Sequence, residues 1–280
     1  MQTGELAAGT AVAAVPHAVD RTILAEQRRE RWRRILLPLA GGCALLLVWW
    51  ALVEIFHVKP FIAPTPQVVA RTFYDKFGML MANLAPTAVE AVGGFMLGNV
   101  AAIVTAAVFV HSRSLDQAFF PAAVLINSIP VVAKAPILVL LLGNGLAPKI
   151  AIAGIICYFP TLVNMVRGLQ AVSPQAMELM HVLSASRREV FFKLRVPTSL
   201  PFLFSALKIA TSTATVGAIV GEWIGSQVGI GALIIQATYN FDAALLYATV
   251  LCGSAFSVLF FLLVRTVEQL VVRWDTGVTP

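Results

Sequence analysis

Charged side chains inside apolar stretches are the first candidates for chemistry in this chain. Lys134 lies between Pro130 and Pro136 within a long apolar region. A charge in such a region is costly in a membrane and usually faces a cavity or the interior of a helix bundle. Lys134 is therefore a candidate for lining a solute pathway, where it would favour an anionic solute. The structural alternative is a lysine that extends to a surface or pairs with Glu90 or Glu54.

Other residue types that could do chemistry are sparse. Asn127 and Ser128 precede Pro130, where they could hydrogen-bond a solute or satisfy carbonyl groups that the proline leaves free, and both interpretations stay open. The four histidines show no HExxH spacing and the cysteines no CxxC pair, so we expect no catalytic and no metal-binding residues. The three cysteines lie in apolar runs and are expected to be small buried side chains: Cys43, Cys157 and Cys252.

The elements that hold these residues are strongly apolar. Hydrophobic residues make up 59% of the 280 positions and charged residues 12%, and the mean hydropathy is +0.84. A soluble domain carries about 25% charged residues, so most of this surface must face lipid. The net charge of +6 comes from basic clusters beside apolar spans, which indicates positive-inside topology rather than nucleic-acid binding.

The apolar stretches predict an all-α membrane protein with six transmembrane helices, because about 20 apolar residues cross a bilayer as a helix. The third stretch contains three prolines and is expected to be kinked or broken. The predicted spans cover residues 35–56, 86–110, 118–142, 149–166, 200–220 and 243–264.

Basic residues place both termini and the polar segment 167–198 in the cytoplasm of a bacterial inner-membrane protein. Residues 35–270 then form the membrane domain, between a disordered basic tail at 1–34 and a cytoplasmic tail at 271–280. Residues near the N-terminus lack the basic start and strong apolar run of a signal peptide, so we expect the first span to be an uncleaved anchor.

Two local patterns predict further structure. Thr65 and Pro66 are typical of the N-cap and first position of a short surface helix. Small residues at regular spacing predict close helix packing: Gly94-x3-Gly98 and Gly217-x3-Gly221-x3-Gly225.

The most informative segment is 173–201, with the sequence SPQAMELMHVLSASRREVFFKLRVPTSLP. Ser173 and Pro174 predict the start of a helix. Ser186 and Glu189 predict the capping box of a second helix, which Pro197 is expected to stop. The first helix carries an apolar stripe at three- and four-residue spacing: Ala176, Met177, Met180 and Leu183.

Two functions fit this amphipathic helix-turn-helix equally well. A basic amphipathic segment can lie on anionic lipid. It can also insert an apolar surface into a groove of a cytoplasmic partner. The physical chemistry of the segment does not separate the two.

The segment also resembles a known family. Glu178-x5-Ser184-x9-Leu194-x-Val196-Pro197 is similar to the EAA loop of ABC importer permeases, EAA-x3-G-x9-I-x-LP. The family's alanine pair is replaced by Leu179 and Met180, and its glycine by Ser184. Further motifs resemble the nitrate, sulfonate and taurine branch, which includes vitamin-precursor permeases: residues 61–66 (FIAPTP), 168–169 (GL), 200–201 (LP) and 221–231 (GEWIGSQVGIG).

The resemblance implies a type I ABC importer permease fold that works as a pair of permease subunits, expected as a homodimer. Two ATPase subunits, using ATP and Mg²⁺, would receive the cytoplasmic loops, and a periplasmic or lipid-anchored binding protein would deliver a small solute. The solute would be an organic anion such as a sulfonate or carboxylate, nitrate, or a vitamin precursor. The implied ATPase-coupling residues are Glu178, Leu183, Ser184, Ala185, Ser186 and Pro197.

On the outer side, the position and the resemblance make Glu222 and Trp223 candidates for an external gate or for receiving the binding protein. The chain lacks a GxxxxGK[ST] phosphate loop, so we expect ATP hydrolysis in a separate subunit. The alternative is an ion-coupled secondary transporter that uses Lys134 and Glu90, which would leave the capped cytoplasmic loop unexplained.

Overall fold

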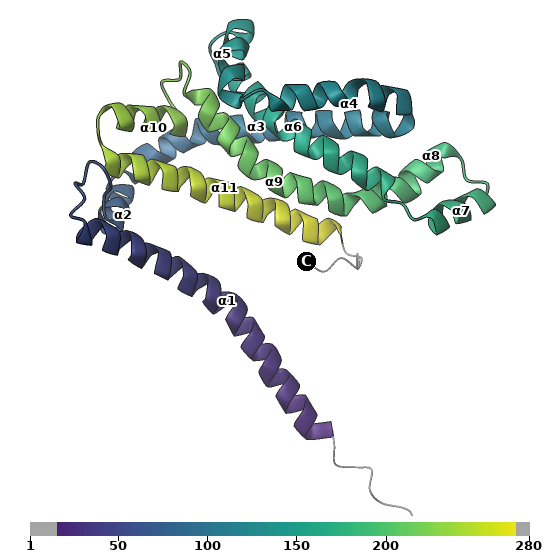
Figure 1. Ribbon diagram of the computed structural model, residues 1–280, viewed down its shortest axis with the longest axis horizontal. Helices are drawn as coiled ribbons and strands as arrows, with labels where there is room; N and C mark the ends of the chain where they lie inside the picture. The colour runs from purple at the N-terminus through teal and green to yellow at the C-terminus, as the bar shows by residue number, and fades with distance from the viewer. Residues whose placement is uncertain (1–15, 273–280) are drawn as a thin grey trace, which may run out of the picture. The chain divides into compact units, whose positions relative to one another are not determined.

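The chain folds as helices. The computed structural model describes residues 16–272, and within them every regular element is helical. The chain forms two compact units, residues 1–59 and 60–280. The first contains α1 (Pro16–Ile55), and the second contains, in chain order, α2 (Pro66–Asp75), α3 (Phe77–His111), α4 (Arg113–Ser128), α5 (Val131–Leu142), α6 (Leu146–Gln170), α7 (Pro174–Val182), α8 (Arg187–Val190), the π-helix η1 (Phe191–Arg195), α9 (Val196–Glu222), α10 (Ile230–Tyr239) and α11 (Ala243–Val271) (Figure 1).

Within the described residues, five helices are long and apolar enough to cross a membrane, and a bent helix pair could supply a sixth span. That pair is α4 and α5, which meet at 101°. The break lies at Ile129 and Pro130, where Ile129 has the extended φ of −68° and ψ of 127° that a following proline imposes. The predicted break in the third apolar region is confirmed, and it occurs at one of the three prolines.

Helix α1 differs from the prediction of a disordered tail at residues 1–34. The helix begins at Pro16 and runs without interruption to Ile55. Its N-terminal half is rich in Ala, Leu, Glu, Gln and Arg, which are strong helix formers, and residues 17–34 contain no glycine or proline. Residues 1–15, like the C-terminal residues 273–280, lie outside the described part of the chain.

Small residues let three helices of the second unit approach closely. Helices α3, α6 and α9 contact one another in all three pairs and run side by side (Figure 1). A Cβ added at Gly94 or Gly98 would overlap Ala153 or the carbonyl oxygen of Gly154. This confirms that the Gly94-x3-Gly98 pair lets α3 pack closely against α6. In the other repeat, Gly217-x3-Gly221-x3-Gly225, the prediction that all three glycines lie on one helical face is wrong at Gly225. Helix α9 ends at Glu222, and Gly225 lies in the following loop.

We expect valine at position 98 to separate α3 from α6, because its side chain has no space beside the Gly154 backbone. Overpacking of this kind costs about 1–3 kcal/mol. The measurement is the midpoint of thermal unfolding of the purified protein in detergent. Gly78→Val is the matched control, because a Cβ at Gly78 meets no atom within 4 Å; equal midpoints for the two variants would contradict the packing.

A polar contact ties α2 and α3 to the start of α11. Asp242 accepts a hydrogen bond from the Leu245 amide at 2.9 Å and pairs with Lys76 at 3.0 Å. Partial burial opposes ionisation, but the amide and the ammonium group outweigh it and lower the pKa of Asp242. At the start of α2, Pro66 occupies the predicted position, whereas Thr65 makes no side-chain cap.

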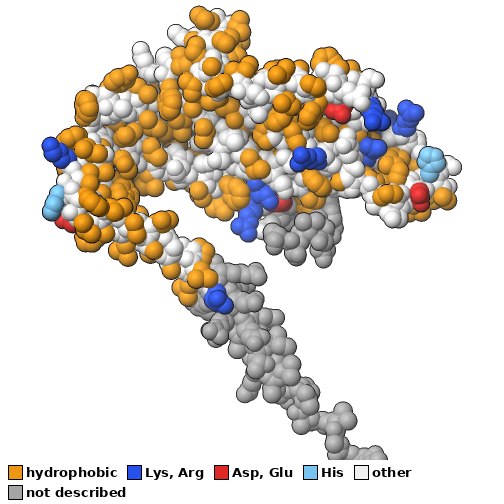
Figure 2. Space-filling model, viewed as in Figure 1, with side chains coloured by type: hydrophobic (Ala, Val, Ile, Leu, Met, Phe, Trp, Pro, Cys, Tyr) orange, Lys and Arg blue, Asp and Glu red, His pale blue; other side chains and the backbone are white. Residues whose placement is uncertain are grey.

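Apolar side chains fill the space between α3, α6, α9 and α11. One buried cluster joins Phe95, Cys157, Phe204 and Phe260, with the rings of Phe95 and Phe260 4.9 Å apart. Cys252 is also buried, whereas Cys43 is exposed on α1, so the prediction of three buried cysteines is wrong at Cys43. Hydrophobic side chains also cover much of the visible outer surface, and basic ones gather near the end where α7 and α8 lie (Figure 2). A surface of this kind requires lipid around it.

Candidate functional site

The segment that joins α6 to α9 forms the predicted helix-turn-helix. Its first helix, α7, begins at Pro174, and the hydroxyl of Ser173 accepts a hydrogen bond from the Ala176 amide at 3.3 Å. The proline stands where a missing N–H costs nothing. Both predictions for the start of this helix are confirmed.

One face of α7 exposes apolar side chains. Leu179, Val182 and Leu183 are 59%, 82% and 65% exposed, at the i, i+3, i+4 spacing of a single helical face. Glu178 beside them is also exposed. The members of the predicted stripe differ in exposure: Leu183 is exposed, whereas Ala176, Met177 and Met180 are half-buried. Leu179 and Val182 were missed, although the same spacing rule marks them as a second stripe.

The turn after α7 is a Schellman motif. The Ser184 amide donates to the His181 carbonyl at 2.9 Å, and the Ala185 amide donates to the Met180 carbonyl at 2.9 Å. Ser184 has a φ of 51°, in the left-handed region that glycine occupies most easily. The serine thus adopts the conformation that the family's glycine would favour, and the two helices turn sharply at this residue.

We expect Ser184→Gly to stabilise this turn by about 1 kcal/mol, because glycine avoids the clash of a Cβ in the left-handed region. Hydrogen-exchange protection of the amides of residues 183–185 measures the change and should rise. Ala185→Gly is the matched control: residue 185 does not have a positive φ, so glycine there should lower protection. Equal responses of the two variants would show that strain at Ser184 is absent.

The second helix starts with the predicted capping box. The Glu189 amide donates to the Ser186 hydroxyl at 3.3 Å, and the Ser186 amide donates back to the Glu189 carboxylate at 3.0 Å. Lys193 pairs with the same carboxylate at 3.0 Å. Ser173 thus caps the start of α7, and the capping box fixes the start of α8 after the Ser184 turn.

The predicted end of this helix at Pro197 is wrong. Helix α8, the π-helix η1 and α9 form one continuous helical path from Arg187 to Glu222. Pro197 occupies the first turn of α9, where its missing N–H is tolerated after the wider π turn. The helix-turn-helix therefore continues directly into a membrane-spanning helix.

Contacts to other helices hold the base of this element. The ring of Phe191 lies 4.7 Å from the ring of His111 at the end of α3. The Arg195 guanidinium donates to the carbonyl of Leu169, near the end of α6, at 3.3 Å. The π-helix η1 therefore joins α8 to α3 and α6 as well as to α9.

The opposite end of the bundle carries a buried polar network, which sequence reasoning did not predict. Glu222 is 1% exposed. One of its oxygens accepts from the Thr87 hydroxyl at 2.6 Å, and the other accepts from the Gly231 amide at 2.5 Å. The Ile230 amide donates to Thr87 Oγ1 at 2.8 Å. These bonds fasten α10 and the loop before it to α3.

A buried ion pair extends this network. The Lys149 ammonium donates to Glu90 at 2.9 Å and to the Ser226 hydroxyl at 2.8 Å. Glu90 is 1% exposed, and the Lys149 side chain is 12% exposed. Glu90 is therefore paired with Lys149. The pair of Glu90 with Lys134, which was one of the structural alternatives considered from the sequence, does not form.

The residues predicted to line a pathway lie in several places. Lys134 is half-buried on α5, and Asn127 and Ser128 are exposed at the end of α4. The Ser128 hydroxyl donates to the Val124 carbonyl at 2.9 Å, one turn back in α4, and not to the Ile126 carbonyl that the missing N–H of Pro130 would leave free. Trp223 is exposed beside the buried Glu222, so of these two only Trp223 is available to a partner protein.

A multi-pass helical bundle with a doubly capped helix-turn-helix between two spans defines the class of a transporter permease. Residues 98–274 match the family of binding-protein-dependent transport system inner membrane components. The chain belongs to this family.

Similar proteins agree with this assignment. The riboflavin transport system permease protein RibX of Chloroflexus aurantiacus is 33% identical over 253 residues, which cover 89% of this chain and 94% of that protein. The formylaminopyrimidine transport permease protein ThiX of Halalkalibacterium halodurans is 30% identical over 231 residues, covering 82% and 92%. The chain is thus the permease component of an ABC importer, as the resemblance predicted.

A solved structure shows the same fold. The inward-facing MetNI methionine ABC transporter matches with a TM-score of 0.52 and 18% identity, over 75% of this chain and 97% of the matched chain. The predicted type I importer fold is confirmed by this match.

Proposed function

We propose that the helix-turn-helix couples this permease to an ATPase in the cytoplasm. The exposed apolar face of α7, beside Glu178, is the observation that carries this proposal. A groove on a partner could bury these side chains. The turn from Leu183 to Ser186 and the continuous helix through Pro197 would transmit movement of the ATPase to the bundle.

The proposed assembly contains two ATPase subunits, which hold ATP and Mg²⁺, and two copies of this permease. A periplasmic or lipid-anchored binding protein delivers the solute at the opposite side. Basic residues in the segment 167–198 support a cytoplasmic position for this segment and for both termini.

The proposed solute is a small vitamin precursor or organic anion, with nitrate included. RibX is named for riboflavin transport and ThiX for formylaminopyrimidine transport, and both names support the first class. Relatives named for aliphatic sulfonates and taurine support the second class. Lys134, half-buried on α5, would favour an anion in the pathway. Asn127, Ser128 and Trp223 are the other proposed pathway or gate residues, and the buried Glu222 would take part in a gate by holding α10 against α3.

Uptake into proteoliposomes tests the proposal. The permease, its ATPase and its binding protein are reconstituted, and labelled solute is chosen from the compounds that the binding protein retains. ATP should drive uptake, and collapse of the proton gradient should leave it unchanged. Uptake that stops with the gradient while ATP remains would instead support an ion-coupled carrier. Labelling of residues 173–196 from the periplasm alone would overturn the orientation.

A further inference from the structure

An apolar groove lies at the end of the bundle that carries the helix-turn-helix. It has a volume of about 600 Å³ and is formed by α3, α6, η1 and α9. Its walls are almost entirely aliphatic and aromatic, with Val104, Leu169 and Leu203 among them. The volume falls within the range of about 300–1,000 Å³ that small-molecule sites occupy.

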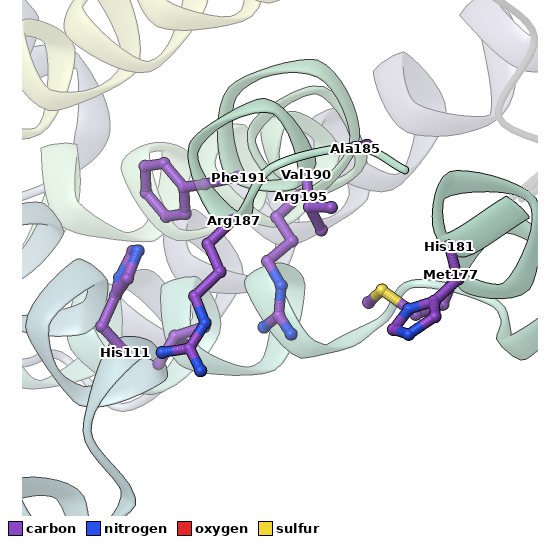
Figure 3. A pocket seen from close by; sticks show the side chains of 9 residues that line it. His111, Met177, His181, Ala185, Arg187, Val190, Phe191 and Arg195 are labelled. Atoms are coloured by element: carbon purple, nitrogen blue, oxygen red, sulfur yellow. The ribbon is translucent and has the colours of Figure 1, made fainter. Parts of the chain in front are cut away.

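A basic pocket adjoins this groove. It has a volume of about 340 Å³, and it shares His111 and Phe191 with the groove. Arg187 and Arg195 line it, and no Asp or Glu does. Figure 3 shows the two arginine side chains extending side by side, with His111 next to them and α7 on the far side. The two cavities therefore meet at the rings of His111 and Phe191, which lie 4.7 Å apart, with the apolar groove on one side and the cationic pocket on the other.

Hydrogen bonds preorganise the cationic part. The Arg195 guanidinium donates to the Leu169 carbonyl at 3.3 Å, which holds the head group of this side chain at the pocket. His111 Nδ1 lies 2.7 Å from the Ala107 carbonyl, and because a carbonyl only accepts, Nδ1 carries the proton. The nearest acid along the chain, Glu189, is already bonded to Lys193 and Ser186. Among the ion pairs of the described residues, none involves Arg187 or Arg195, so their charges are available to an anion.

We propose that this site binds an anionic phospholipid, with an acyl chain in the apolar groove and the phosphate against Arg187 and Arg195. Basic pockets between membrane helices bind anionic head groups, and an apolar groove next to such a pocket suits a chain attached to that head group. A free anion would use only the pocket, and an apolar peptide only the groove. The proposal goes beyond the coupling function and uses a different surface from the exposed face of α7.

This arrangement would let both functions considered for the helix-turn-helix coexist. The face with Leu179 and Val182 is left for a protein partner, while the side with Arg187 and Phe191 contacts lipid. A lipid in this place would touch the junction at which α8 and η1 join the bundle.

Lipid binding to the full-length purified permease, without ATPase, tests the proposal. Native mass spectrometry counts retained phosphatidylglycerol and phosphatidylcholine with the same acyl chains. We expect phosphatidylglycerol to bind more tightly, and Arg187→Gln to weaken it about fivefold, the factor typical of one basic residue near an anionic membrane. Ala107→Phe, which narrows the groove, should weaken both lipids.

Arg265→Gln is the matched control, because Arg265 is exposed on α11, and no residue of α11 lines the pocket or the groove. It should bind phosphatidylglycerol like the parent protein. Equal losses for the variants at positions 187 and 265 would overturn the proposal. Two other results would also overturn it. In the first, inorganic phosphate competes fully with phosphatidylglycerol, and Ala107→Phe leaves lipid binding unchanged. In the second, cross-linking finds a second copy of the chain in the groove.

Discussion

Val182→Asp, alone or with Leu179→Asp, is expected to abolish ATP-driven uptake while leaving the permease inserted in the membrane. Val182 is 82% exposed and Leu179 59% exposed, so neither substitution disturbs the core. If these side chains are buried against the ATPase, each contributes about 1.5–3 kcal/mol to association. A carboxylate in their place would also remain unpaired at the interface. Association should weaken by about 100-fold or more.

Co-purification of the ATPase with tagged permease measures this effect directly, and solute uptake measures its consequence. His181→Asp is the control, because His181 is also exposed on α7 but lies on the opposite side, toward the basic pocket. It should retain the ATPase. Full retention of the ATPase by Val182→Asp and Leu179→Asp would exclude the α7 face as the docking surface.

Lys149→Met is expected to cause a large loss of stability. It removes the ammonium group that pairs with Glu90 at 2.9 Å, and it leaves a carboxylate that is 1% exposed without its counter-charge. Breaking a buried ion pair by removing one partner costs about 3–5 kcal/mol. The midpoint of thermal unfolding in detergent should fall strongly, and ATP-driven uptake should fall with it.

The double variant Lys149→Met with Glu90→Gln should recover part of this loss, because no unpaired charge stays buried. Lys193→Met is the comparison for a surface pair: its partner Glu189 is 46% exposed and Lys193 69% exposed. Exposed pairs contribute about 0–1 kcal/mol, so that midpoint should hardly move. A Lys149→Met protein as stable as the parent would show that the pair contributes little.

Local chemistry determined the features that the sequence predicted best. Ser173 and Ser186 cap helices through hydrogen bonds to amides three residues away, so the bonding groups are already close in the chain. The three prolines of the third apolar stretch predicted a break in it, but only Pro130 breaks the helix, because Pro121 and Pro136 lie inside α4 and α5. Hydropathy likewise indicated the membrane spans, because each helix in lipid must be apolar along its own length.

Tertiary structure alone decided which distant groups meet. Glu90 and Lys149 are separated by 59 residues, and Glu222 and Thr87 by 135, so no local pattern could pair them or show that Glu222 is buried. The same holds for Pro197: its tolerance depends on a π turn, and neighbouring helices hold the segment containing that turn through Phe191 and Arg195. Side chains on different helices meet only where packing brings those helices together, and packing depends on the whole bundle.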